Sequence, residues 1–211
     1  EARRSFAGFI ARRRHGRPHV TLKLATSLDG HIALPDGTSR WITGEAARAH
    51  AHLERSRHEA ILVGRGTWEA DTPRLDVRLE GLEKQSPLRV ILTSTPFVSG
   101  EVEKRPGAEQ PLLDCARSER DRIAIGSPED IVTLPVDHLL VEGGAETAAA
   151  FLRADLIDRL LLYRAPILVG TGRSAIGDLG LADLAAAHER WHLLDARPLG
   201  SDRLEVYERR R

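Results

Sequence analysis

The sequence predicts an α/β domain in which a mixed sheet carries helices on its faces. Short apolar runs typical of buried strands alternate with amphipathic helical segments, and the chain ends in a pattern typical of an antiparallel hairpin. Strands separated by helices favour parallel pairing, and the hairpin adds antiparallel strands. No internal repeat or low-complexity linker interrupts residues 19–211. We therefore expect one domain there, preceded by a linker or arm over residues 1–18.

The composition disfavours several classes of function. Among 211 residues, 31 Lys and Arg balance 31 Asp and Glu, so the basic excess of a typical nucleic-acid-binding protein is missing. No stretch approaches the roughly 18 apolar residues that span a bilayer. The single cysteine, Cys115, can form neither an internal disulfide nor a cysteine-rich zinc site. We expect a cytoplasmic protein with no nucleic acid, membrane or metal. Because Met is absent, we also expect a piece of a longer chain.

Strand and helix patterns alternate through the first half of the chain. Its predicted strands cover residues 20–25, 60–63 and 89–94. A turn is expected at residues 27–30. Thr43 is a candidate cap for a helix over residues 45–57, whose Ala46, Ala49 and Leu53 share one face.

The second half contains a predicted strand–helix–strand unit and the closing hairpin. Its predicted strands cover residues 138–141, 158–163, 191–194 and 204–207. The helix follows the first strand, with a shared face formed by Ala145, Ala148, Ala149, Leu152 and Leu156. Residues 198–201 predict the hairpin turn. Residues 99–120 show poor periodicity and predict a loop-rich stretch.

The strongest chemical signal is Glu142-Gly143-Gly144, between a predicted strand and a predicted helix. Two glycines let the backbone approach a ligand closely, and a helix N-terminus offers free N–H groups and the positive end of the helix dipole. That arrangement suits a phosphate or pyrophosphate. An ordinary tight turn would use the same two glycines, so the spacing leaves both interpretations open.

Two further glycine-rich segments follow predicted strands, one over residues 167–169 and the other over residues 60–63. Residues 170–175 match G-x-G-x-x-A, but the hairpin pattern after them replaces the helix and parallel strand that a dinucleotide-binding fold needs. Residues 64–67 end in Thr67, which could bind a phosphate or a ribose hydroxyl. Arg78, further along, could fork two phosphate oxygens. A solvated polar loop would show the same residues.

Four segments, taken in order, resemble the reductase domain of the bifunctional riboflavin-biosynthesis deaminase/reductase. They are Lys23-Leu24-Ala25-Thr26-Ser27-Leu28-Asp29-Gly30, Ser39-Arg40-Trp41-Ile42-Thr43, residues 64–78, and Val141-Glu142-Gly143-Gly144. The likeness runs from about residue 6 to the C-terminus. Four motifs in the family's order and spacing are far more specific than any one of them.

The resemblance implies a dihydrofolate-reductase-like fold, NADPH as hydride donor and a homodimer. The implied substrate is a phosphorylated pyrimidine, 5-amino-6-(5-phosphoribosylamino)uracil, whose ribosyl group becomes a ribityl group. The family's deaminase half is missing from the sequence and could lie upstream in a longer chain. A preference for NADPH over NADH would need a basic group near the adenosine ribose, for which Lys104 and Arg105 are candidates.

The resemblance also assigns ligands to individual positions. The implied dinucleotide contacts are Ala25, Trp41, Thr67, Asp71, Ser94, Gly143 and Gly144. The implied substrate contacts are Ser39, Arg55, Leu75, Arg78 and Glu142. Arginines are forked donors suited to a 5′-phosphate, and a carboxylate can accept from ribose hydroxyls or uracil N–H groups. Arg48 lies on nearly the same helical face as Arg55, and spacing alone leaves open which of them binds.

Lys23 and Asp71 are the candidate catalytic residues. Lys23 faces away from the apolar side of its predicted strand, and either residue could lie near the reacting ribose; a solvated Lys23 is the alternative. The family commonly has Asp-Asp-Pro where this chain has Asp71-Thr72-Pro73, and Asp76 stands where Thr is frequent. These departures leave the detailed role of Asp71 open.

Two other functions remain compatible with the sequence. One is a related reductase of the same fold that acts on a diaminopyrimidine or a pterin. The other is a catalytically silent module that keeps a nucleotide pocket.

Overall fold

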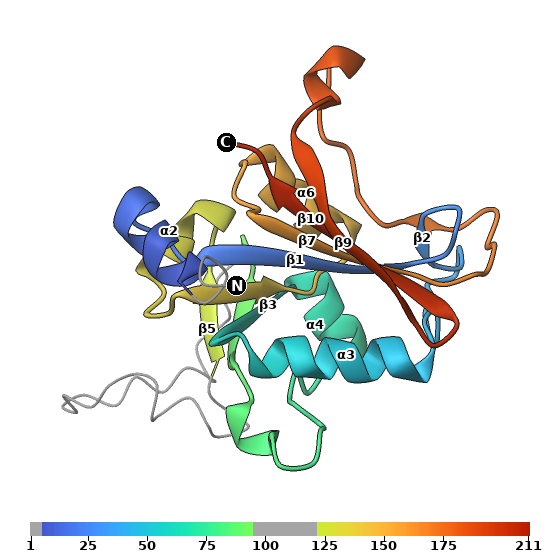
Figure 1. The fold of residues 1–211 in the computed structure, drawn as a ribbon, viewed down its shortest axis with the longest axis horizontal. Helices are drawn as coiled ribbons and strands as arrows, with labels where there is room; N and C mark the ends of the chain where they lie inside the picture. Colours follow the sequence, from blue (N-terminus) through green and yellow to red (C-terminus); the bar gives the residue numbers. More distant parts are fainter. Residues whose placement is uncertain (1–5, 95–121) are drawn as a thin grey trace.

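A single eight-stranded sheet organises the computed structural model, which describes residues 6–94 and 122–211 (Figure 1). Its strand order is β5-β4-β3-β6-β1-β7-β10-β9. These strands are β1 (His19–Thr26), β3 (Ala60–Gly64), β4 (Leu88–Leu92), β5 (Arg122–Ile125), β6 (His138–Val141), β7 (Arg159–Arg164), β9 (Trp191–Leu199) and β10 (Asp202–Arg209). Two short strands, β2 (His31–Ala33) and β8 (Arg173–Ser174), form a separate antiparallel pair.

Strand direction places six carboxyl ends at one edge of this sheet. β5, β4, β3, β6, β1 and β7 are mutually parallel. β10 pairs antiparallel to β7, and β9 antiparallel to β10. The loops that leave parallel strands therefore gather on one side of the molecule, the usual place for a ligand site in such sheets.

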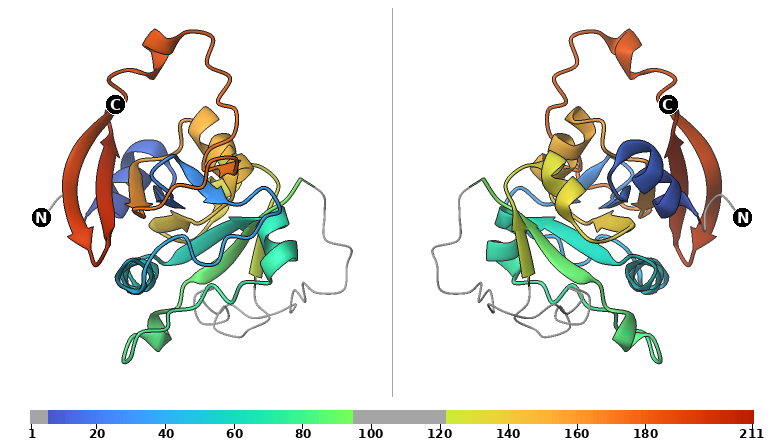
Figure 2. Two further views of the ribbon diagram at one scale, coloured as in Figure 1. Left: turned by 90° about the vertical axis from the view of Figure 1, so that its right-hand side faces the viewer. Right: turned by 90° about the vertical axis from the view of Figure 1, so that its left-hand side faces the viewer.

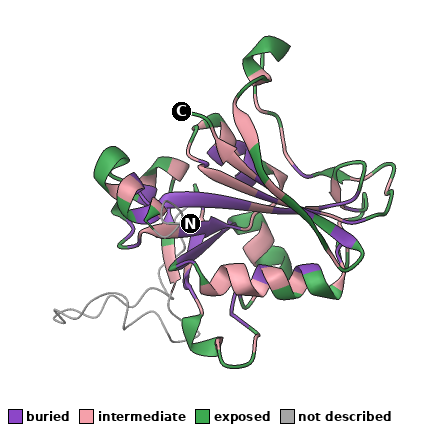
Figure 3. Cartoon of the chain, viewed as in Figure 1, coloured by how far each residue is buried: buried purple, intermediate pink, exposed green. Residues whose placement is uncertain are grey.

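Helices cover both faces of the sheet. They are α2 (Ala7–His15), α3 (Glu45–Ser56), α4 (Arg65–Asp71) and α6 (Ala145–Arg153), with 3-10 helices at Glu83–Gln85, Pro128–Thr133 and Leu184–Ala187. On one face, Phe151 of α6 packs with Val20 and Leu139 in the larger core cluster. On the other face, Ala47 of α3 packs with Tyr163 in a second cluster. Figure 2 shows the two helices on opposite sides, and Figure 3 shows the buried central strands.

The predicted fold class is confirmed, and most of the expected elements are present within a few residues of their predicted ends. Several local predictions are wrong. The residues of α3 that are buried are Ala47 and Ala51, whereas Ala46 and Ala49 of the predicted face are exposed. Gly44, not Thr43, is the N-cap of α3. α6 ends at Arg153, so Leu156 is not part of its face. Of the two interpretations left open for residues 64–67, the polar loop does not hold, since α4 begins at Arg65, directly after β3.

The segment after residue 170 does not resemble a dinucleotide fingerprint in structure either. Residues 167–169, the strand expected before it, are not a strand, because β7 ends at Arg164. Arg173 and Ser174 form β8, which pairs with β2, and no helix begins there. The expected loop-rich stretch at residues 99–120 lies outside the described residues, together with Lys104, Arg105 and Cys115.

Part of the segment expected to be a linker or arm is attached to the sheet. Residues 7–15 form α2. Arg17 then binds the Asp158 carboxylate with two nitrogens, at 2.7 and 3.0 Å. The same carboxylate accepts from the backbone N–H of Val20 at 2.9 Å. These contacts lie at the amino-terminal ends of β1 and β7, away from the edge where the predicted motifs gather.

Two glycines let α6 approach the ends of β3 and β6. A Cβ at Gly64 would lie 2.2 Å from Thr147 Oγ1 and 3.5 Å from Thr147 Cβ. A Cβ at Gly143 would lie 2.5 Å from Thr147 Cβ itself. Since Thr147 is buried, it has little room to move aside. The glycine residues thus set the depth at which the start of α6 packs.

We expect Gly64→Ala to lower the free energy of unfolding by about 1–3 kcal/mol, the usual cost of overpacking. Combining it with Thr147→Ala should remove most of that cost, because only the 3.5 Å contact would remain. Gly143→Ala should not be relieved by Thr147→Ala, since the 2.5 Å contact is to an atom that alanine keeps. Urea unfolding of the singles and doubles measures these couplings. Equal rescue of both glycine variants would contradict this packing.

Candidate active site

A buried charge cluster lies where β1 and β6 approach α3. Glu142 directly follows β6, and its backbone N–H donates to Leu62 O at 2.9 Å. Arg55 of α3 forks the Glu142 carboxylate, with Nε to Oε1 at 2.8 Å and Nη2 to Oε2 at 2.9 Å. Lys23 of β1 places Nζ 3.8 Å from Oε2. Three predicted site residues from three separate elements are thus in contact.

The cluster keeps Glu142 ionised. Burial alone would raise the pKa of this carboxyl, but the positive charges of Arg55 and Lys23 and the Arg55 hydrogen bonds lower it to about 2. Its side chain is only 10% exposed, so these charges act with little screening. Glu142 is therefore a fixed negative acceptor, and a carboxylate has more lone-pair sites than Arg55 and Lys23 use.

The structure separates the two arginines that the helical spacing left open. Arg55 points to Glu142, and its Nη1 also donates to the backbone oxygen of Asp76 at 3.1 Å. Arg48 donates to Thr43 O at 2.6 Å, and its guanidinium lies 4.6 Å from the centre of the Trp41 ring. Only Arg55 belongs to the buried cluster.

The segment after α4 passes close to this cluster. Asp71, the last residue of α4, is exposed, and no ion pair joins it to Lys23. Leu75 is buried against Ile61 and Leu140, so a substrate could reach this residue only through its backbone. Arg78 is exposed and lies near Asp76, with Nε 3.5 Å from Oδ1.

The residues expected to hold the dinucleotide are spread along the same edge of the sheet. Gly144 and Thr67 are neighbours, since a Cβ at Gly144 would lie 3.7 Å from Thr67 Oγ1. The glycine is also the N-cap of α6, whose first N–H groups are available there. Ala25 lies on β1, two residues after Lys23. Ser94 is exposed just after β4.

Ser39 and Trp41 lie in the segment between β2 and α3. Both are exposed, Trp41 to 65%, and neither is hydrogen-bonded to Lys23, Arg55 or Glu142. Trp41 offers an aromatic face beside the Arg48 guanidinium. Lys23, Arg55 and Glu142 are thus in contact, and Gly144 lies beside Thr67. Ser39 and Trp41 lie apart from both groups.

Polar groups that no sequence pattern indicated lie around the cluster. Tyr163 on β7 is 1% exposed, and its hydroxyl lies 2.8 Å from His50 Nδ1 on α3. Burial raises the pKa of this phenol far above its usual range. Lys23 Nζ lies 5.9 Å from the centre of the Tyr163 ring. A tyrosine in a strand pattern looks like an ordinary core residue, so the sequence carried no signal for this pair.

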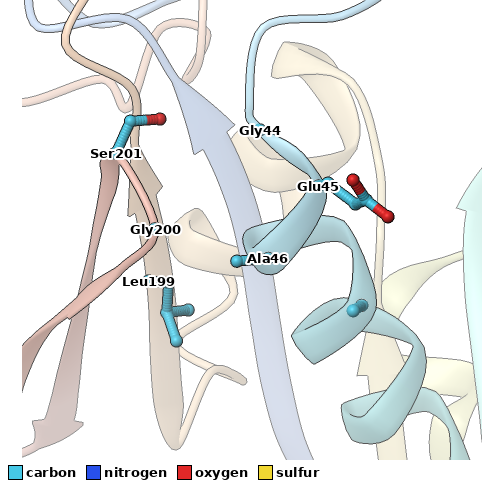
Figure 4. A pocket seen from close by; sticks show the side chains of 7 residues that line it. Gly44, Glu45, Ala46, Leu199, Gly200 and Ser201 are labelled. Carbon is cyan, nitrogen blue, oxygen red and sulfur yellow. The ribbon is translucent and has the colours of Figure 1, made fainter.

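A cavity of about 510 Å³ lies elsewhere, between the start of α3 and the turn of the β9–β10 hairpin (Figure 4). It is lined by Gly44, Glu45, Ala46, Ala49, Leu199, Gly200 and Ser201. None of the predicted site residues lines it, so the charge cluster and this cavity are separate features.

Within the described part of the chain, no group of three His, Cys, Asp or Glu side chains could hold a metal ion. None of the helices described there is long and apolar enough to cross a bilayer.

Most of the chain matches one known protein family. The model of the RibD C-terminal domain matches residues 18–123 and 129–204. The chain belongs to this family. The RibD protein of Mycobacterium tuberculosis H37Rv is 40% identical over 200 residues, which is 93% of this chain and 56% of that protein. The Escherichia coli K12 protein is 32% identical over 235 residues, covering 96% of this chain and 63% of its own length.

Solved RibD structures share the fold. Acinetobacter baumannii RibD superposes with a TM-score of 0.78 at 29% identity, over 100% of this chain and 63% of that one. A Thermotoga maritima structure has a TM-score of 0.77 at 27% identity, over 99% of this chain and 61% of that one. That protein is named diaminohydroxyphosphoribosylaminopyrimidine deaminase/5-amino-6-(5-phosphoribosylamino)uracil reductase. The chain spans 56–63% of the length of these four RibD proteins.

Proposed function

We propose that the chain reduces the ribosyl group of 5-amino-6-(5-phosphoribosylamino)uracil to a ribityl group, with NADPH as the reductant. The observation that carries this proposal is the ionised Glu142, held by Arg55 and approached by Lys23, immediately before the Gly143–Gly144 turn. A fixed acceptor, the Lys23 amino group and a turn suited to an anion lie together there. Membership of the RibD C-terminal domain family supports the same assignment.

The residues at the carboxyl edge fit a dinucleotide. Gly144 leaves a space that a Cβ would fill, beside Thr67 Oγ1 and the free N–H groups of α6. These donors suit a pyrophosphate. The exposed Trp41 ring offers a stacking surface next to Arg48. When bound, NADPH supplies a hydride from its nicotinamide ring.

The protein's own task is to orient the opened sugar and to supply a proton. Ring opening at the anomeric carbon gives an imine at C1′, and its conversion to the amine consumes one hydride and one proton. Glu142 accepts from ribose hydroxyls or uracil N–H groups and so fixes the orientation of the substrate. Lys23 Nζ, 3.8 Å from this carboxylate, donates the proton that the reduced substrate receives.

Arg78 holds the 5′-phosphate in this proposal. Its side chain is 58% exposed, so a charged ligand can reach it, and its guanidinium can fork two phosphate oxygens. We expect Arg78→Ala to keep the fold and to weaken the substrate complex by about 1.5–3 kcal/mol, or roughly 10- to 150-fold. Steady-state kinetics would show a raised KM. A KM equal to that of the parent chain would remove Arg78 from the site.

Several finer assignments rest on the resemblance. We include NADPH rather than NADH, a cytoplasmic location and a homodimer in the proposal. The deaminase named for the Thermotoga maritima relative suggests that the chain is the reductase part of a longer bifunctional protein. Light scattering of the purified chain tests the dimer directly.

A substrate panel tests the reaction. The purified chain, with NADPH, is offered the deaminated phosphoribosylaminouracil, its diaminopyrimidine precursor and a dihydropterin, and absorbance of the nicotinamide is followed. We expect decay only with the uracil compound. A preference for the diaminopyrimidine or the pterin would assign a related reductase, and binding of NADPH without decay in any reaction would assign a silent module.

A further inference from the structure

A buried carboxylate lies between two exposed guanidinium groups at the edge of the charge cluster. Asp76 is 9% exposed as a residue. Its Oδ2 lies 2.9 Å from Arg74 Nη2, and its Oδ1 lies 3.5 Å from Arg78 Nε. The Arg74 and Arg78 side chains are 71% and 58% exposed. The two arginines therefore face solvent with a negative charge behind them.

The backbone holds this carboxylate in place. Leu75, immediately before it, has φ of 54° and packs its side chain into the core. The backbone oxygen of Asp76 accepts from Arg55 Nη1 at 3.1 Å and lies 3.2 Å from His52 Nδ1. With the preceding residue buried and its own carbonyl bound to α3, Asp76 has little freedom to turn away from the two guanidinium groups.

The ion pairs of this carboxylate are incomplete. Asp76 Oδ1 is buried, yet no hydrogen bond reaches it. Each guanidinium carries five N–H donors, and a carboxylate bound at one edge leaves the other edge for a second anion. Arg74 and Arg78 can thus bind a phosphate on their solvent side while Asp76 remains behind them.

We propose that Asp76 sets the phosphate affinity of the site by weakening phosphate binding at the Arg74–Arg78 pair. The inference rests on the proposed function for the role of Arg78 and adds Arg74 as a second phosphate ligand. An arriving phosphate meets two positive charges and, behind them, one negative charge, so the Asp76 carboxylate repels it and partly neutralises the two guanidinium groups. The site then binds a phosphorylated substrate moderately and releases the phosphorylated product, which carries the same group.

Calorimetric titration with ribose 5-phosphate tests this without any turnover, and ribose serves as the uncharged comparison. We expect Asp76→Asn to tighten ribose 5-phosphate binding about three- to tenfold. The variant removes one negative charge a few ångströms from the phosphate, and an effect of this size is expected at a partly exposed site. Arg74→Gln should weaken binding by a similar factor. Ribose binding should not change in either variant, and unfolding curves check that each variant is folded.

Asp195→Asn is the matched control. Asp195 also forms an ion pair with an arginine, Arg197, on the distant strand β9, so its removal should leave ribose 5-phosphate binding unchanged. Unchanged or weaker binding by Asp76→Asn would overturn the proposal, as would binding that does not depend on Arg74. If the parent chain reduces the pyrimidine but the titrations do not show these changes, only the role of Asp76 is refuted. If the titrations show them but the parent chain does not reduce the pyrimidine, the proposed function is refuted.

Discussion

Lys23→Gln should lower kcat roughly 10²- to 10⁴-fold, the usual contribution of a positioned proton donor. Glutamine keeps most of the side-chain length but carries no transferable proton. The affinity for NADPH should stay close to that of the parent chain, because Lys23 contacts Glu142 rather than the glycine turn. Stopped-flow or steady-state measurement of nicotinamide absorbance gives kcat, and a direct titration gives the NADPH affinity.

Two companion variants make this result specific. Lys84→Gln is the matched control, since Lys84 is exposed in the 3-10 helix Glu83–Gln85 and its loss should not affect turnover. Asp71→Asn measures the other candidate catalytic residue, which is exposed and has no ion pair with Lys23. If Lys23→Gln retains turnover within about threefold, a proton-donor role is contradicted.

Arg55→Met should reduce the free energy of unfolding by about 3–5 kcal/mol, because it leaves the buried Glu142 carboxylate without its main partner. Lys23, at 3.8 Å, compensates only in part. The double variant Arg55→Met with Glu142→Gln should recover much of the loss, since it removes the uncompensated charge. Urea unfolding at neutral pH gives the three values.

Arg57→Met on the same helix is the control for Arg55→Met. Arg57 also binds a glutamate, Glu54 at 2.7 Å, but its side chain is 57% exposed whereas that of Arg55 is 14% exposed. We expect Arg57→Met to cost less than about 1 kcal/mol, as exposed ion pairs do. Equal costs for the two methionine variants would contradict a special role for the buried pair.

The strands and helices could be predicted because each depends on local periodicity. The strand 138–141 coincides with β6, and the helix 45–57 differs from α3 by one residue at its end. The cap of α3 was predicted at the wrong residue. Thr43 is a good capping residue type, but the helix begins at Glu45, so Gly44 is the N-cap. A single-residue boundary lies below what a pattern can resolve.

The site could be predicted only as separate residues. Arg55 and Glu142 are 87 positions apart, and nothing in either local pattern indicates that they bind each other. The pairing follows from the position at which α3 packs against the sheet relative to the end of β6, which is a tertiary property. The buried side chain of Leu75 follows from a left-handed backbone conformation that its residue type disfavours. The Asp76 ion pairs depend on the same turn.

In the proposed reaction, the chain directs a hydride to C1′ of the phosphoribosylaminouracil. The most direct test uses NADPH deuterated at the transferable position of nicotinamide C4, with the product examined by mass spectrometry and NMR. We expect a ribityl product that carries one deuterium, located at C1′. A product without deuterium at that carbon, or no product while the NADPH and pyrimidine both bind, would contradict it.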